Sequence, residues 1–236
     1  MPGYAAEQHA ILLIADPKII SVPVIDNHEP MVDLKNQRTI AYGPSPEIPD
    51  NTDYTHMRKT VYERLVKAQL LLPKELHFCL YEGYHSLQLQ KMLFDERYSR
   101  VKAKHPGWSH KQLFQETTKL VSPVVNLDGS QNIPPHSTGG AIDVYLINDK
   151  GDAVDMGIHP KDWMQDLNGS LSLTNSHVIS EEAKHYRTIM NHALLAVGFV
   201  NYPTEFWHWS FGDRYWAYIQ HKPHAMYSNY KRENHK

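Results

Sequence analysis

The sequence has a single cysteine, Cys79, among 236 residues, so no disulfide can form within the chain. Long apolar runs are missing as well. The apolar stretch at residues 10–15 is too short for a secretory signal or a membrane-spanning helix, and no lysine or arginine precedes it. We therefore expect a soluble, cytoplasmic protein with a buried thiol.

An excess of charge of one sign is also missing. The chain has 24 lysines and arginines against 26 aspartates and glutamates, and its short basic run is Lys231-Arg232. This balance argues against nucleic acid or an anionic membrane as a partner. The length and the 41% hydrophobic content suit one large domain or two small ones, with a substantial core.

Periodicity and capping residues indicate an extended beginning followed by mixed helices and strands. The first fifty residues are rich in proline and turn formers, so we expect an extended segment, with a short strand at 19–25, that packs on a core built later. Helices are predicted at 54–72, from Ser86, at 109–120, at 180–197 and around 214–219, and strands at 77–84 and 141–147. Without repeats or a linker, this irregular mixture favours one α+β domain over residues 1–236, with a mostly antiparallel central sheet flanked by helices.

Two stretches carry side chains suited to chemistry. In PPHSTGGAIDVYL, residues 134–146, a Gly139-Gly140 turn lets His136 fold back over the start of the strand that carries Asp143. In PTEFWHWSFGD, residues 203–213, Glu205 and His208 stand among aromatic residues. Burying charge in such surroundings is costly unless a partner compensates it.

His136, Asp143 and His208 form a set of two histidines and one carboxylate, which suits a catalytic zinc with three protein ligands and one open position. Glu205 is the natural base for the attacking water. Residues three apart on a regular strand point to opposite faces, so Glu205 must lie in a bend or bulge before the strand that carries His208. Spacing alone leaves a second interpretation open, in which these polar groups are hydrogen-bonded in an ordinary core. The other Glu-x-x-His copy, Glu182 to His185, is interpreted as a solvated surface pair, and no HExxH occurs.

At these residues the sequence resembles the D-alanyl-D-alanine dipeptidases, the VanX-type enzymes related to zinc DD-carboxypeptidases. The family motif H-x-x-G-x-A-x-D is matched from His136 to Asp143, and its E-W-W-H motif appears as EFWH, from Glu205 to His208. EGY at 82–84, VDMG at 154–157 and GF at 198–199 follow the family order. The resemblance covers about residues 54–218.

The resemblance implies a zinc metallopeptidase that hydrolyses D-Ala-D-Ala to two D-alanines, with one zinc per chain held by His136, Asp143 and His208. Glu205 is then expected to take a proton from water and to deliver it to the leaving amine. A small D,D-dipeptide would be the substrate, and the resemblance leaves open whether the role lies in glycopeptide resistance, in the recycling of cell-wall peptidoglycan or elsewhere. Trp207 and Tyr84 are expected to contact the substrate.

The chain departs from the family where the substrate is handled. EGY continues with His85, where the family has an arginine expected to stabilise the oxyanion. His85 could donate in its place, Lys161 or Arg187 could reach in, or His85 could simply be a helix-entry residue.

Two further departures concern the substrate's ammonium group. Pro134 replaces a serine that the family often has near this group, and Asp162 is the match for the aspartate expected to hold it. Two alternatives therefore stay open. One is a zinc carboxypeptidase or amidohydrolase acting on other peptidoglycan-derived peptides, and the other is a catalytically silent homologue that binds a metal or a peptide.

Overall fold

A computed structural model describes residues 11–49, 51–166 and 168–230; Lys231-Arg232 and residue 10 lie outside these ranges. The centre of the fold is a five-stranded sheet in the order β2-β4-β5-β7-β6. The short β2 runs parallel to β4, and the other neighbouring strands are antiparallel. The predicted α+β domain with a mostly antiparallel sheet is therefore confirmed. The strands are β2 (Ala41–Tyr42), β4 (Leu76–Glu82), β5 (Ala141–Asn148), β6 (Val200–Tyr202) and β7 (Glu205–Ser210).

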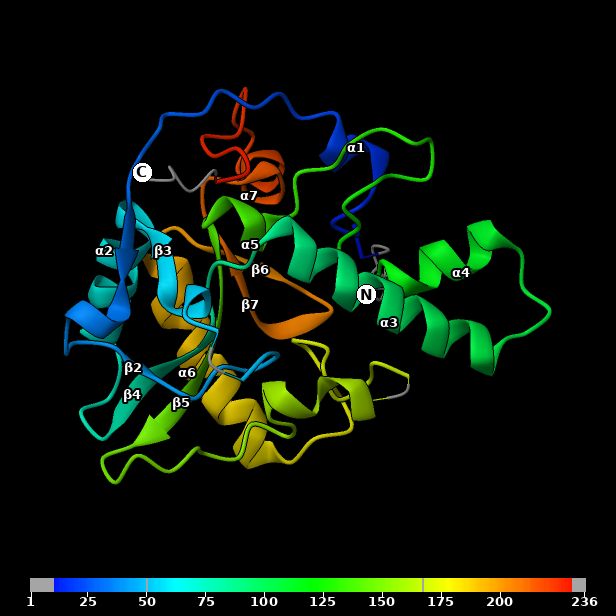
Figure 1. The fold of residues 1–236 in the computed structure, drawn as a ribbon. Coiled ribbons are helices and arrows are strands. Elements are labelled where there is room, and N and C mark those ends of the chain that lie inside the picture. Colours follow the sequence, from blue (N-terminus) through cyan, green and yellow to red (C-terminus); the bar gives the residue numbers. More distant parts are fainter. Residues whose placement is uncertain (1–10, 50, 167, 231–236) are drawn as a thin grey trace, which may run out of the picture.

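Helices surround this sheet, and Figure 1 shows α3 and α4 as a pair that extends away from it. Apolar residues of α2, such as Leu65, and of α6, such as Met190, pack into one core with the sheet residues Val144 and Trp209. Cys79 is buried on β4, as expected. The helices are α1 (Pro17–Ile20), α2 (Lys59–Gln69), α3 (Leu87–Lys104), α4 (His110–Thr117), α5 (Pro135–Thr138), α6 (Glu181–Ala196) and α7 (Arg214–Ile219).

Serine caps begin three of these helices where the sequence predicts them. The Ser86 and Ser180 side chains accept hydrogen bonds from the backbone N–H groups of Leu89 and Ala183. Ser109 forms a reciprocal capping box with Gln112. In the part of the chain that the structure describes, no helix is both long and apolar enough to cross a membrane.

The first part of the chain differs most from expectation. The strand predicted at 19–25 is wrong, because α1 covers its beginning and only a single bridge joins Val24 to Ala225. The helix predicted from residue 54 begins at Lys59, after a 3-10 turn (Asp53–Thr55) and strand β3 (His56–Arg58). β3 pairs antiparallel with β1 (Met31–Asp33). Tertiary pairing thus overrides the local helical pattern there.

Arg58 joins the N-terminal segment to the loop that carries His136. Its buried guanidinium donates to the backbone carbonyls of Thr138 (2.8 Å) and Glu29 (2.5 Å). Gly139, which ends α5 with φ +72°, has no room for a Cβ because Met31 of β1 lies against it. These contacts hold the His136 loop against the β1–β3 pair and the N-terminal segment.

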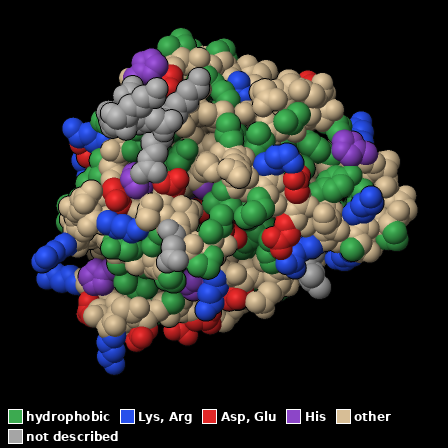
Figure 2. Space-filling view, viewed as in Figure 1, with side chains coloured by type: hydrophobic (Ala, Val, Ile, Leu, Met, Phe, Trp, Pro, Cys, Tyr) green, Lys and Arg blue, Asp and Glu red, His purple; other side chains and the backbone are tan. Residues whose placement is uncertain are grey.

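On the face seen in Figure 2, lysine and arginine side chains are scattered among acidic ones. This distribution agrees with the small net charge of −2.

Candidate metal centre

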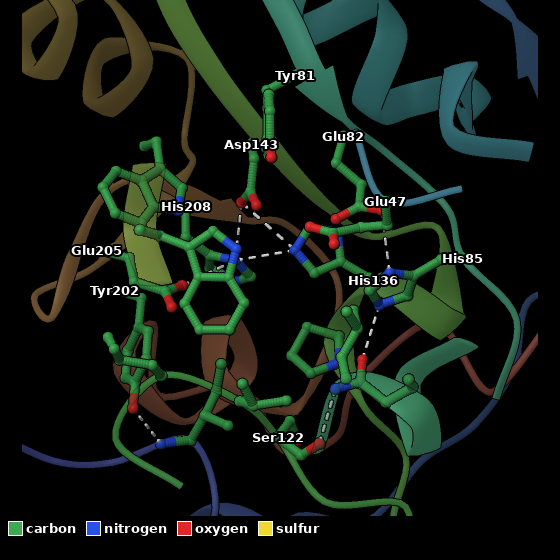
Figure 3. A pocket seen from close by; sticks show the side chains of 18 of the residues that line it. Glu47, Tyr81, Glu82, His85, Ser122, His136, Asp143, Tyr202, Glu205 and His208 are labelled. Carbon is green, nitrogen blue, oxygen red and sulfur yellow. Dashed lines mark hydrogen bonds and ion pairs between the residues drawn. The ribbon is translucent and has the colours of Figure 1, made fainter. Parts of the chain in front are cut away.

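The three predicted ligands come together at one end of the central sheet. His136 lies on α5, Asp143 on β5 and His208 on β7, where Asp143 and His208 are register partners. His136 Nε2 is 3.1 Å from His208 Nδ1, and Asp143 Oδ1 is 3.3 Å and 3.1 Å from these two nitrogens. Figure 3 shows the three side chains converging from their separate elements.

This arrangement fits a metal ion. Ligands about 2.0–2.1 Å from a tetrahedral zinc lie roughly 3.3 Å from one another, close to the separations observed here. Asp143 Oδ1 is buried and forms no hydrogen bond. His136 Nδ1 donates to the carbonyl oxygen of Gly83 at 2.7 Å, which leaves the lone pair of Nε2 directed toward the other two ligands. The donor set therefore suits zinc.

The pKa shifts of Asp143 and His136 also fit a binding site for a cation. Burial by itself disfavours the charged form of Asp143, yet the neighbouring imidazoles hold the pKa of this carboxyl well below its usual range. Burial also opposes the charge of His136, but Asp143 raises the pKa of this imidazole to about 9. The centre of the set thus attracts positive charge strongly.

Glu205 stands beside the set, with Oε2 3.8 Å from His208 Nδ1. An irregularity in β7 allows both side chains to face the same pocket. Asn201 of β6 pairs with Trp209, whereas the next residue, Tyr202, pairs with Glu205. An irregularity is therefore present, but it lies within β7, between Glu205 and Trp209, rather than before the strand.

The side chain of Asn201 compensates this irregularity. Its amide Nδ2 donates to the carbonyl oxygens of Glu205 (3.2 Å) and His208 (3.0 Å). These carbonyls would otherwise lose ladder partners. Burial and then the charge of Asp143 raise the pKa of Glu205 well above its ordinary value, as expected of a proton-accepting group near neutral pH.

A pocket of about 630 Å³, including its open mouth, lies over this centre. Trp207 and His85 are among the residues that line it. Tyr84 is not among the lining residues and packs edge-on against the ring of Tyr230.

The loop that follows the VDMG stretch contributes to the pocket lining a different residue from the one expected. Asp162 lies in a 3-10 helix (Pro160–Gln165), accepts a hydrogen bond from Gln165 at 3.0 Å and does not line the pocket. Its neighbour Trp163 does.

Both ring nitrogens of His85 already face acceptors. Nε2 lies 2.7 Å from Gln90 Oε1, and Nδ1 lies 3.2 Å from Glu82 Oε1. Gln90 donates its amide Nε2 to the carbonyl of Ser122 at 2.7 Å, which sets the orientation of the amide. Donation to a substrate oxyanion would therefore require His85 to give up one of these contacts.

The two other cationic side chains that were considered as donors to the oxyanion do not reach the pocket. Neither Lys161 nor Arg187 lines the pocket. The Arg187 guanidinium instead donates to the backbone carbonyls of Met156, Leu171 and Leu173.

Glu47 is a pocket residue that sequence reasoning missed. It lines the pocket together with Glu82. Burial and then the charge of Glu82 raise the pKa of Glu47 to about 7. Glu47 stands in a proline-rich stretch without periodicity, so no local signal marks it.

A convergent histidine–aspartate–histidine set with a buried glutamate beside it has the composition expected of a metallopeptidase site. Comparison with known proteins places the chain further: it belongs to the peptidase family described as D-ala-D-ala dipeptidase, whose model matches residues 55–228. The resemblance inferred from the sequence motifs is thereby confirmed.

One relative is the protein named D-alanyl-D-alanine dipeptidase from Synechocystis sp. (strain ATCC 27184 / PCC 6803 / Kazusa). It is 25% identical over 229 residues, which cover 87% of this chain and 91% of that protein.

Solved structures also overlap with most of the chain. VanYB in complex with D-Alanine-D-Alanine has 16% identity and a TM-score of 0.44, covering 87% of this chain and 93% of that one. A mutant of the vancomycin resistance D,D-pentapeptidase VanY in complex with Zn(II) has 15% identity and a TM-score of 0.39, covering 87% and 95%.

Proposed function

We propose that this chain hydrolyses D-alanyl-D-alanine to two D-alanines, with one zinc ion held by His136, Asp143 and His208. The observation that carries the proposal is the set of near-equal separations of 3.1–3.3 Å among their three ligand atoms. Membership of the dipeptidase family and the name of the Synechocystis relative support the substrate.

The residues divide the chemistry among them. When bound, zinc supplies a Lewis acid that polarises a carbonyl and makes water more acidic. Glu205 accepts a proton from the attacking water and passes it to the nitrogen of the leaving D-alanine. The raised pKa of Glu205 makes its carboxylate a stronger base than usual. Such a base suits both steps, because it takes the proton from water readily and carries it to the leaving nitrogen.

The pocket walls position the substrate and restrict water. Trp207 and Tyr202 line the pocket near Glu205 and present large aromatic surfaces. A drier site strengthens the electrostatic interactions within it. His85 acts through its neighbours in this proposal, by holding Glu82 and Gln90 in place with its two ring nitrogens.

The test is release of D-alanine from D-Ala-D-Ala by the zinc-loaded protein, compared with the Glu205→Gln variant. We expect kcat to fall by about 10²–10⁴-fold in this variant while its zinc content stays unchanged. Glu182→Gln is the matched control, because Glu182 stands three residues before a histidine too but is exposed on α6. It should keep full activity.

Other outcomes separate the alternatives. If the unaltered protein releases D-alanine only from an N-acylated peptide ending in D-Ala-D-Ala, it is a carboxypeptidase. If it binds zinc but cleaves neither peptide, the hydrolase proposal is wrong.

A further inference from the structure

The stretch PTEFWHWSFGD contains two polar residues, Ser210 and Asp213, that the proposed chemistry does not use. Both are deeply buried, since Ser210 is 0% exposed and Asp213 is 1% exposed. Burying a hydroxyl or a carboxylate is costly unless the group has a partner. The partners of these two side chains therefore indicate what the residues do.

The two histidines of the candidate metal centre turn opposite ring nitrogens toward the other ligand atoms. His136 faces them with Nε2, while its outer nitrogen Nδ1 donates to the carbonyl oxygen of Gly83 at 2.7 Å. His208 faces them with Nδ1, which Figure 3 shows directed at Asp143 and His136. A histidine that binds a metal through Nδ1 carries its proton on Nε2, so the outer nitrogen of His208 must donate to an acceptor.

Ser210 provides this acceptor. Its Oγ lies 3.4 Å from His208 Nε2. The two residues stand two positions apart on β7, so their side chains point to the same face of the strand. Once Nε2 donates to Oγ, the hydroxyl proton of Ser210 points away from the imidazole and needs an acceptor of its own.

Asp213 lies where it can accept that proton. The chain bends after β7 at Gly212, where φ is +77° and the ring of Tyr227 leaves no room for a Cβ. Asp213 Oδ1 accepts a hydrogen bond from the N–H of Trp216 at 2.9 Å, but in the described part of the chain no hydrogen bond of standard geometry reaches its buried Oδ2. Burial raises the pKa of Asp213, and the Trp216 N–H and the Ser210 hydroxyl oppose this rise.

We propose that Ser210 and Asp213 hold the imidazole of His208 in place for metal binding, through hydrogen bonds from His208 Nε2–H to Ser210 Oγ and from the Ser210 hydroxyl to Asp213 Oδ2. Both are positioning residues, because neither belongs to the ligand set or lines the pocket. The carboxylate at the end of this chain of hydrogen bonds fixes the ring orientation and makes the imidazole a stronger donor to the metal. The inference rests on the proposed zinc site.

Zinc affinity tests the inference without substrate or turnover, when the metal-free protein competes with a chelator for zinc. We expect Ser210→Ala to weaken zinc binding by about 10–100-fold. Ser210→Thr keeps the hydroxyl and should retain most of the affinity. Asp213→Asn keeps an oxygen that can cap α7 but removes the charge, so it should weaken zinc binding in the same direction and by less.

A double variant tests whether Asp213 acts through Ser210. If it does, Ser210→Ala combined with Asp213→Asn should bind zinc no more weakly than Ser210→Ala alone, because the hydroxyl that links the carboxylate to His208 is already gone. Losses of affinity that multiply in the double variant would overturn the proposed chain of hydrogen bonds.

The matched control is Ser137→Ala, beside the other histidine ligand. Ser137 is 1% exposed, and among the described residues its buried Oγ has no hydrogen-bond partner, so zinc affinity should stay unchanged. Thermal unfolding of the metal-free variants shows whether each is folded. Unchanged affinity in Ser210→Ala, or equal losses in Ser210→Ala and Ser137→Ala, overturns the inference even if the unaltered protein hydrolyses D-Ala-D-Ala. If the unaltered protein binds no zinc, the proposed function is wrong as well.

Discussion

Asp143 and Glu47 line the same pocket but respond to it in opposite ways. Burial penalises the charge of both, yet the pKa of Asp143 is held well below its usual range, whereas the pKa of Glu47 rises to about 7. Asp143 faces the imidazoles of His136 and His208, while Glu47 faces other carboxylates. The partners, rather than burial, decide which of two buried acids stays ionised.

The difference divides the pocket into two regions. On the β5–β7 side, an ionised carboxylate and two imidazoles form the proposed metal site. On the side of the N-terminal segment, the charged groups that act on Glu47 are carboxylates, so this acid lacks the cationic partners that keep Asp143 ionised. Three substitutions test this comparison.

Asp143→Asn should have the largest effect, because asparagine brings no charge to the metal centre. Loss of an outer partner of a metal ligand typically costs 10–100-fold in affinity, so loss of a ligand should weaken zinc binding by more than about 100-fold. Competition with a chelator measures this affinity. Asp149→Asn, at an exposed aspartate just after the same strand, is the control. Unchanged zinc binding in Asp143→Asn would show that Asp143 is not a zinc ligand.

His85→Leu should come next, because it leaves the buried Glu82 without its imidazole partner. Glu82 is 5% exposed and His85 3% exposed, and leaving a buried polar group without its partner costs about 1–3 kcal/mol, and more when that group is charged. Chemical denaturation measures the free energy of unfolding. His77→Leu breaks a pair with Asp149 that is largely in solvent and should cost far less. Equal losses in both variants would contradict a buried Glu82–His85 pair.

Glu47→Gln should have the smallest effect, and it should be a gain in stability. The pKa of Glu47 rises from 4.5 to about 7 on folding, so below pH 4.5 the group is protonated in both states. As pH rises through this window, the unfolded chain ionises first and the folded state loses stability. Glutamine avoids this loss, so thermal unfolding should show the variant more stable by about 1–3 kcal/mol at pH 8 and no different at pH 4. An equal difference at both pH values would assign the effect to packing instead of charge.

Much of the fold could be predicted because its signals are local. Ser86, Ser109 and Ser180 each cap a helix, since a serine oxygen satisfies N–H groups only a few residues ahead. The same holds for His136 and Asp143, which one turn and one strand bring together. The need for an irregular strand between Glu205 and His208 also followed from strand alternation, although its position did not.

The errors occur where distant segments meet. Strand β3 has a helical sequence pattern but pairs with β1, far away along the chain. Asp162 was matched to the family's aspartate from the order of motifs, but the packing of that loop places its neighbour Trp163 in the pocket instead.

The sequence by itself identified the family, because several short motifs occur in the family's order, and it named His136, Asp143, His208 and Glu205 as candidate ligands and base. Only the tertiary structure decided which residues form the wall of the pocket on the other side from Glu205. Glu47 reaches the pocket because β2 pairs with β4 and sets its loop at the sheet edge, a contact between segments that no local pattern encodes.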